Sequence, residues 1–287
     1  MPDCATSASP HVDSAWHASL ALDFADDAGT TRLVGRRHAG PLRVQKALYP
    51  EGGAVCHAIV VHPPGGVVGG DQLHIEARVG PAAHAFLTSP GAAKWYKANG
   101  KVSRQRVHLH AAAGASVEWM PQESIFFEHA HVALEHSVTL AADASYIGCE
   151  IICLGRCASG ESFDSGKITQ RTEVRRGGKL VWWEQGALDG AGALPGSPLG
   201  LNGHSVCASL LAVGKPLPAA ALESLRALDA QLDHGGQFGV THMKGVLSAR
   251  YLGGDSEQAR RVMLAVWQRL RPFLLAREGH VPRIWNT

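Results

Sequence analysis

The chain contains 287 residues, of which 45% are hydrophobic and 18% are charged, as in an ordinary globular protein. Its 27 basic and 25 acidic residues leave a formal net charge of +2, so no long-range field favours nucleic acid or an anionic membrane. The sequence lacks both the run of about 18 apolar residues that spans a membrane and the basic and apolar regions of a secretory signal. We therefore expect a cytoplasmic protein that binds neither nucleic acid nor membranes.

Short strands broken by glycine and proline are predicted from residue 16 to about residue 211, whereas residues 1–15 are expected to be disordered. In the segment 71–79 the apolar residues share one face, as in a half-buried strand: Leu73, Ile75, Ala77 and Val79. Similar runs occupy residues 55–61, 86–89, 102–109, 116–120, 132–140, 145–154, 167–175 and 179–184. Many short strands with turn residues between them predict a layered β structure.

The C-terminal part changes to a helical period. Leucines at steps of three and four, between Pro218 and Gly235, predict one helix: Leu222, Leu225, Leu228 and Leu232. A second helix begins at Asp255, where Gln258 completes a capping box, and Pro272 should end or bend it. The prediction is a mainly β (α+β) fold in a single domain over residues 16–287, with a β scaffold at 16–211 and a helical pair plus strands at 212–287.

No catalytic motif is present. The segment 160–168 resembles a phosphate loop, but five residues separate its glycines and Ile168 replaces the hydroxyl that binds Mg²⁺. The sequence holds no H-E-x-x-H, no G-x-S-x-G and no zinc quartet. Cys149, Cys153 and Cys157 recur every four residues, which is not the spacing of a zinc site, and we expect reduced cysteines that serve packing. We therefore do not expect an enzyme.

Five short strings occur in order along the chain: His62-Pro-Pro-Gly-Gly-Val-Val-Gly-Gly-Asp71, Pro90-Gly-Ala-Ala-Lys-Trp-Tyr96, Trp119-Met-Pro-Gln-Glu123, Cys153-Leu-Gly-Arg156 and Pro282-Arg-Ile-Trp285. Together they resemble the UreD (UreH) family of urease accessory proteins, from about residue 16 to the C-terminus. The residues that carry the motifs are Gly65, Gly66, Gly69, Gly70, Lys94, Tyr96, Gln122, Glu123, Arg156 and Glu161.

The resemblance implies a fold and a function. The fold would be a right-handed, β-helix-like stack of sheets with two C-terminal α-helices. The function would be that of a metallochaperone scaffold that binds UreF, which recruits the GTPase UreG, so that the assembly docks on apo-urease while nickel is inserted. A dimeric assembly through UreF is expected. Nickel would pass transiently, and no cofactor would be tightly bound.

Three carboxylates are candidates for an internal nickel path. Strand parity places Asp71, Glu150 and Glu184 on faces that otherwise carry apolar side chains. A buried, isolated carboxylate is costly, and a water-filled passage for a divalent cation would relieve that cost. Alternatively, each carboxylate forms a structural ion pair, for which Arg156 and Lys94 are available, or reaches solvent at a strand end.

The histidines and glycines leave further alternatives open. His57 and His62 are candidates for the path but lie on opposite faces of one predicted strand, so they cannot both bind one ion. The group His129, His131 and His136 marks either a nickel entrance or a solvated hairpin, and the glycines at 65–70 either an anion cradle or a permissive connection. Two other functions remain: a docking module without nickel passage, or a metal-dependent hydrolase that uses histidines with Glu123 or Glu161.

Overall fold

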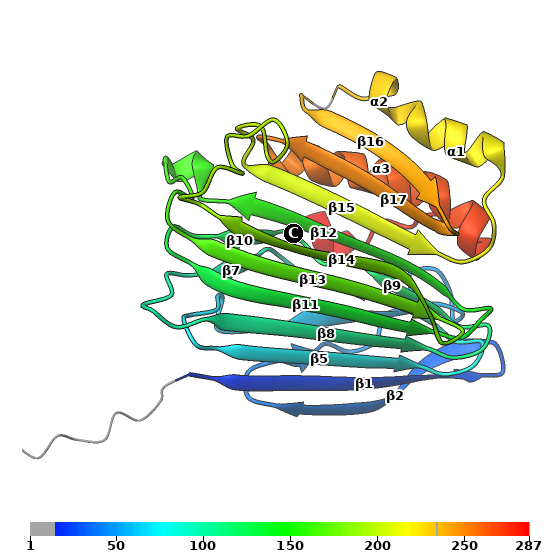
Figure 1. The fold of residues 1–287 in the computed structure, drawn as a ribbon. Helices are drawn as coiled ribbons and strands as arrows, with labels where there is room; N and C mark the ends of the chain where they lie inside the picture. The colour runs from blue at the N-terminus through cyan, green and yellow to red at the C-terminus, as the bar shows by residue number, and fades with distance from the viewer. Residues whose placement is uncertain (1–14, 234, 287) are drawn as a thin grey trace, which may run out of the picture.

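The computed structural model describes residues 15–233 and 235–286 and consists of two stacked β-sheets with α-helices near the C-terminus (Figure 1). The first sheet has the spatial order β14 (Lys179–Asp189), β13 (Lys167–Arg176), β11 (His131–Leu140), β8 (Ser103–Ala111), β5 (Gln72–Val79), β1 (His17–Asp27) and β2 (Thr30–Ala39). The second has the order β16 (Gln237–Met243), β17 (Val246–Gly253), β15 (Val206–Val213), β12 (Ser145–Leu154), β9 (Ser116–Trp119), β6 (His84–Thr88), β4 (Cys56–Val61) and β3 (Arg43–Val44), and β7 (Ala93–Trp95) and β10 (Ser124–Phe126) join it beside β12.

The chain alternates between the two sheets and winds as a β-solenoid of about four turns. Strands β5, β8 and β11 are parallel neighbours in the first sheet, and β6, β9 and β12 are parallel neighbours in the second. Parallel neighbours require a crossover, and here each crossover contains a strand of the opposite sheet. The predicted mainly β fold of stacked sheets is confirmed.

Burial follows the alternation that the sequence predicts. On β5, Leu73 and Ile75 are at most 5% exposed and point between the sheets, whereas His74 between them points to the outer face and is half-buried. Strand β12 begins and ends at the predicted residues, Ser145 and Leu154. The last predicted strand, in contrast, continues five residues further, to Asp189.

Two hydrophobic cores share the second sheet. One fills the space between the sheets and takes Tyr146 and Ile152 from β12. The other, here called the outer core, lies between the opposite face of that sheet and the C-terminal helix, and takes Ile147 and Ile151 from the same strand. Because β12 is buried on both faces, its sequence is a nearly continuous apolar run that only Glu150 interrupts with a charged residue.

The helical segments are α1 (Ala219–Arg226), α2 (Leu228–Gln231), α3 (Ser256–Leu275) and two 3₁₀ turns, η1 (Cys157–Ser159) and η2 (Arg283–Asn286). The first predicted helix is therefore divided, with Ala227 between α1 and α2. Asp255 caps α3 by accepting hydrogen bonds from two backbone N–H groups, whereas Gln258 contacts Arg261 instead of completing the capping box. Pro272 lies inside α3, which continues to residue 275.

Helix α3 packs across β12, β15 and β17, on the face of the second sheet that points away from the first sheet (Figure 1). None of the described helices combines the length and apolar content needed to cross a membrane. The predicted disordered segment, residues 1–15, lies outside the described residues except for Ala15.

Candidate functional site

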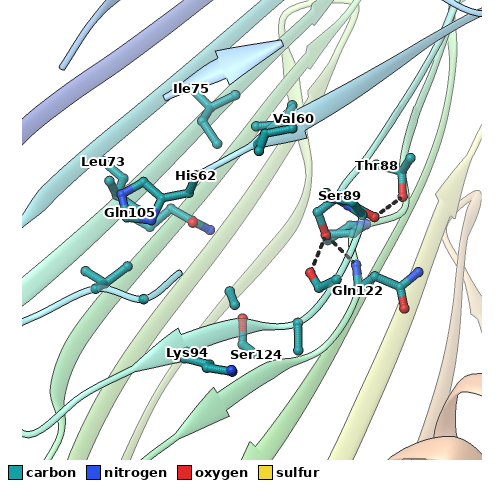
Figure 2. A pocket seen from close by; sticks show the side chains of 18 of the residues that line it. Val60, His62, Leu73, Ile75, Thr88, Ser89, Lys94, Gln105, Gln122 and Ser124 are labelled. Carbon is teal, nitrogen blue, oxygen red and sulfur yellow. Dashed lines mark hydrogen bonds between the residues drawn. The ribbon is translucent and has the colours of Figure 1, made fainter. Parts of the chain in front are cut away.

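A pocket of about 220 Å³ lies between the two sheets. Leu73 and Ile75 of β5 form one side of it, and Val60 of β4 faces them from the second sheet (Figure 2). The polar residues that line it are His62, Thr88, Ser89, Lys94, Gln105, Gln122, Ser124 and Glu150. A mainly apolar recess with a few polar groups is the usual composition of a binding site.

His62, directly after β4, contributes an imidazole to the pocket (Figure 2). Its Nε2 atom is buried and has no hydrogen-bond partner within the described part of the chain. Burial lowers the pKa of His62 below its ordinary value, although the nearby Asp71 carboxylate acts in the opposite direction. The imidazole is therefore neutral near pH 7, and one ring nitrogen carries a lone pair.

Glu150 brings a carboxylate to the same pocket from β12, as strand parity predicts. Its Oε2 atom accepts a hydrogen bond of 2.6 Å from Gln170 Nε2, and 26% of its side-chain surface remains accessible. Burial raises the pKa of Glu150 to about 7, because the bond from Gln170 offsets only part of the desolvation and Glu184 adds repulsion. The group therefore keeps its proton to a higher pH than an exposed carboxyl group does.

His136 on β11 lies beside Glu150, with 3.8 Å between Nδ1 and Oε1. The side chain is buried, and its Nε2 atom is 2.9 Å from the hydroxyl of Tyr146. Burial lowers the pKa of His136 to about 3, so the ring is neutral. The interpretation of this residue as part of a solvated hairpin or entrance is wrong, because its neighbours on the same strand face, Leu134 and Val138, belong to the core.

Asp71 is buried, but its oxygens are occupied by backbone groups. Oδ1 accepts from the N–H of Trp16 at 2.9 Å, and Oδ2 from the N–H of Val68 at 3.1 Å. These bonds join the start of β1 to the glycine-rich segment that precedes β5. Asp71 is not among the residues that line the pocket, although it lies close enough to influence His62.

Glu184 is 38% exposed and forms an ion pair with Arg250, with 2.7 Å between Oε1 and the guanidinium. Glu184 shares the inner face of the first sheet with Trp182, as expected, but the expectation that Leu180 lies on the same face is wrong. A β-bulge pairs Trp182 with Val174 but Leu180 with the adjacent residue of β13, so the two side chains point to opposite faces. Leu180 is consequently 48% exposed.

His57 and His62 lie on opposite sides of the second sheet, as predicted. His57 stacks on Phe86 in the outer core, and its Nε2 is 2.7 Å from Oε1 of Glu51. Glu51 in turn binds the guanidinium of Arg271, which is fully buried in α3. This places His57 in a structural charge network away from the pocket.

The glycines of residues 65–70 serve close packing. A Cβ atom on Gly66 would lie 2.1 Å from a ring carbon of Tyr96, and one on Gly69 would lie 1.9 Å from the carbonyl oxygen of Ala98. The flanking Gly65 has φ near +79°, and Gly70 also has positive φ. The permissive interpretation of this segment is therefore confirmed.

Most of the other motif residues form ion pairs and packing contacts. Arg156 Nε is 2.5 Å from Oε2 of Glu161, and its guanidinium covers the ring of Phe127. Glu123 pairs with Arg260 of α3. The remaining motif residues, Lys94 and Gln122, line the pocket (Figure 2).

The described residues contain no group of three or more His, Cys, Asp or Glu side chains arranged to hold a metal ion. Cys149 and Cys153 are buried free thiols, and burial raises the pKa of Cys153 to about 12. Both belong to the outer core, which confirms the packing interpretation for these two residues. For Cys157 that interpretation is wrong, because its thiol is exposed.

The model of the family described as UreD urease accessory protein matches residues 17–286. The urease accessory protein UreD of Janthinobacterium sp. (strain Marseille) is 62% identical over 270 residues, which cover 94% of this chain and 91% of that protein. The protein of the same name from Nitrosospira multiformis is 54% identical over 276 residues, covering 96% and 99% respectively. The chain therefore belongs to the UreD family of accessory proteins, which serve the maturation of urease.

Proposed function

We propose that this chain is a cytoplasmic scaffold for nickel insertion into apo-urease, acting in a complex with UreF and the GTPase UreG. Membership in the UreD family supports a role in maturation. Because the sequence holds no complete phosphate-binding loop, we assign the hydrolysis of GTP to UreG. The exposed side of α1–α3 is the surface we assign to UreF, through which two copies of the assembly would dimerise.

We further propose that nickel passes through the interior of the chain. The observation that carries this proposal is the pocket between the sheets, which a neutral imidazole, His62, and a carboxylate, Glu150, both reach. Imidazole and carboxylate are both ligands that divalent nickel accepts. A carrier must also release its cargo: a nanomolar site would hold the ion by about 12 kcal/mol, whereas separate, weak ligands permit transfer.

The alternative is a docking module past which nickel travels outside. It is favoured by the engagement of two of the three candidate carboxylates in structural contacts, Asp71 with backbone N–H groups and Glu184 with Arg250. Both functions need the same partners, so only a change confined to the pocket separates them.

The test is urease activation with the pocket filled. Apo-urease, UreF, UreG, GTP and Ni²⁺ are incubated with the chain or with its Ser124→Phe variant, which places a ring in the pocket. Ser137→Phe is the matched control, because Ser137 lies on β11 with its side chain on the outer face of the first sheet. Nickel per urease and ammonia release are measured.

An internal path predicts that Ser124→Phe abolishes activation while it still co-purifies with UreF, and that Ser137→Phe activates normally. Equal activation by both variants would reject the path and leave the docking module. Activation that does not depend on the chain at all would reject the scaffold function itself. Hydrolysis by the purified chain alone, without urease, would support the hydrolase alternative.

A further inference from the structure

Two polar side chains from opposite sheets meet between β11 and β12, next to the pocket. Nδ1 of His136 and Oε1 of Glu150 are 3.8 Å apart, which is too long for a hydrogen bond. The His136 side chain is 5% exposed, and Nδ1 has no hydrogen-bond partner among the described residues. Unsatisfied buried polar atoms are rare in native proteins, so this nitrogen requires an explanation.

The other polar atom of each side chain is already engaged. Nε2 of His136 is 2.9 Å from the hydroxyl of Tyr146, and Oε2 of Glu150 accepts from Gln170 at 2.6 Å. A bond at one ring nitrogen decides how the other is used: when Nε2–H donates to Tyr146, the lone pair of Nδ1 is directed toward the carboxylate. Two electron-pair donors then face each other across a gap.

Gly148 makes this arrangement possible. A Cβ atom at that position would lie 1.8 Å from the hydroxyl of Tyr146. The phenol therefore extends over the bare backbone of Gly148 to reach His136. Tyr146, with the space that Gly148 leaves for it, holds the imidazole in place, as groups behind a metal ligand commonly do.

We propose that His136 Nδ1 and Glu150 Oε1 are the protein ligands of an interior site for a divalent transition-metal cation such as Ni²⁺. This inference rests on the internal nickel path proposed above and adds a nitrogen ligand to it. Bonds of about 2.1 Å separate adjacent octahedral ligands by about 3.0 Å and opposite ones by about 4.2 Å. The observed 3.8 Å lies between these limits, so a small side-chain rotation brings both atoms into coordination.

Two protein ligands suit transit rather than storage. Because the described residues provide no third His, Cys, Asp or Glu at this point, water completes the coordination shell. Gln170 and Tyr146 act as positioning residues, since each orients a ligand without touching the ion. Nitrogen and oxygen donors together favour Ni²⁺ and its neighbours over Mg²⁺ and Ca²⁺, which prefer oxygen alone.

The test is Ni²⁺ binding to the purified full chain, measured by equilibrium dialysis and calorimetry. We expect His136→Gln and Glu150→Gln each to weaken one Ni²⁺ site at least tenfold. The control is His110→Gln, which removes a histidine that is 44% exposed on the outer face of the first sheet and should leave that site intact. Tyr146→Phe should weaken the site several-fold, because the imidazole loses its orienting bond.

Unchanged Ni²⁺ stoichiometry and affinity in both ligand variants would overturn the site. Circular dichroism verifies folding, and the isosteric Glu150→Gln variant decides the question if His136→Gln does not fold. The assay contains neither urease nor UreG, so it is independent of the proposed function. Loss of binding with normal urease activation would leave the site but remove it from the path, whereas normal binding with chain-dependent activation would remove the site alone.

Discussion

Replacing Arg271 by methionine is expected to destabilise the chain by several kcal/mol. The Arg271 side chain is 0% exposed and binds two carboxylates: its guanidinium is 3.0 Å from Oε1 of Glu118 and 2.5 Å from Oε2 of Glu51. Glu118 is also 0% exposed and accepts a hydrogen bond from Trp267. Methionine fills the volume of the alkyl part but leaves both carboxylates without the guanidinium.

Removal of one partner from a buried ion pair costs about 3–5 kcal/mol. At about 2–4 °C per kcal/mol for a chain of this size, the melting temperature should fall by about 6–20 °C. The control is Arg261→Met on the same helix, where the guanidinium is exposed and the expected loss is below about 1 kcal/mol. Urea denaturation at pH 7 gives both free energies of unfolding.

The sign of the pH dependence provides a second measurement. Burial alone would raise the pKa of Glu51, but hydrogen bonds from His57 and Arg271 outweigh it and lower the pKa to about 2. Because the pKa of Glu51 is lower in the folded state, the ionised carboxylate stabilises the fold above the ordinary value of 4.5. This stabilisation is lost as pH falls toward 2. The gap between wild type and Arg271→Met should therefore narrow over this range. A gap below about 1 kcal/mol at pH 7, or one that does not change with pH, would refute the reasoning.

Three further outcomes are expected. The pKa of Glu150 rises from 4.5 to about 7 on folding. As pH increases between these values, the free energy of unfolding of the wild type should therefore fall by about 3 kcal/mol relative to that of Glu150→Gln. Urea titrations across this pH range measure the difference. Gly66→Ala should cost about 1–3 kcal/mol because its Cβ would meet Tyr96, whereas Gly91→Ala, with open space at Cβ, should be neutral in thermal melts. Asp255→Ala should cost about 1 kcal/mol through loss of the cap of α3, measured by urea denaturation.

Much of the strand architecture is predictable because one face of each strand is buried and the other is not. Alternation identifies β5, and on β11 it also predicts that His136 is buried. His136 shares its face of β11 with Val132, Leu134 and Val138, which are all in the core. Grouping His136 with the nearby His131 hides this. The two residues are an odd number of positions apart, so in a strand they lie on opposite faces.

Other features have no local signal. The bulge in β14 puts Leu180 and Trp182 on opposite faces of the sheet, and no residue type between them predicts a bulge. The Arg271 network joins residues that are 153 and 220 positions apart in the sequence. A single sequence states neither which strand faces α3 nor which acidic residue meets the guanidinium, because both depend on how the sheets stack.

Two carboxylates on neighbouring strands of the second sheet show why Glu150 stands apart. Glu118 of β9 faces α3, and although burial alone would raise its pKa, hydrogen bonds from His84 and Trp267 and the charge of Arg271 lower it. Glu150 of β12 points to the opposite side, where an amide is its hydrogen-bond donor and its pKa rises. Glu118 therefore has a cationic partner that offsets its burial, whereas Glu150 on the neighbouring strand has only an amide donor. Strong perturbation without a compensating partner is typical of functional groups, which is why we propose that Glu150 is the carboxylate that takes a divalent cation.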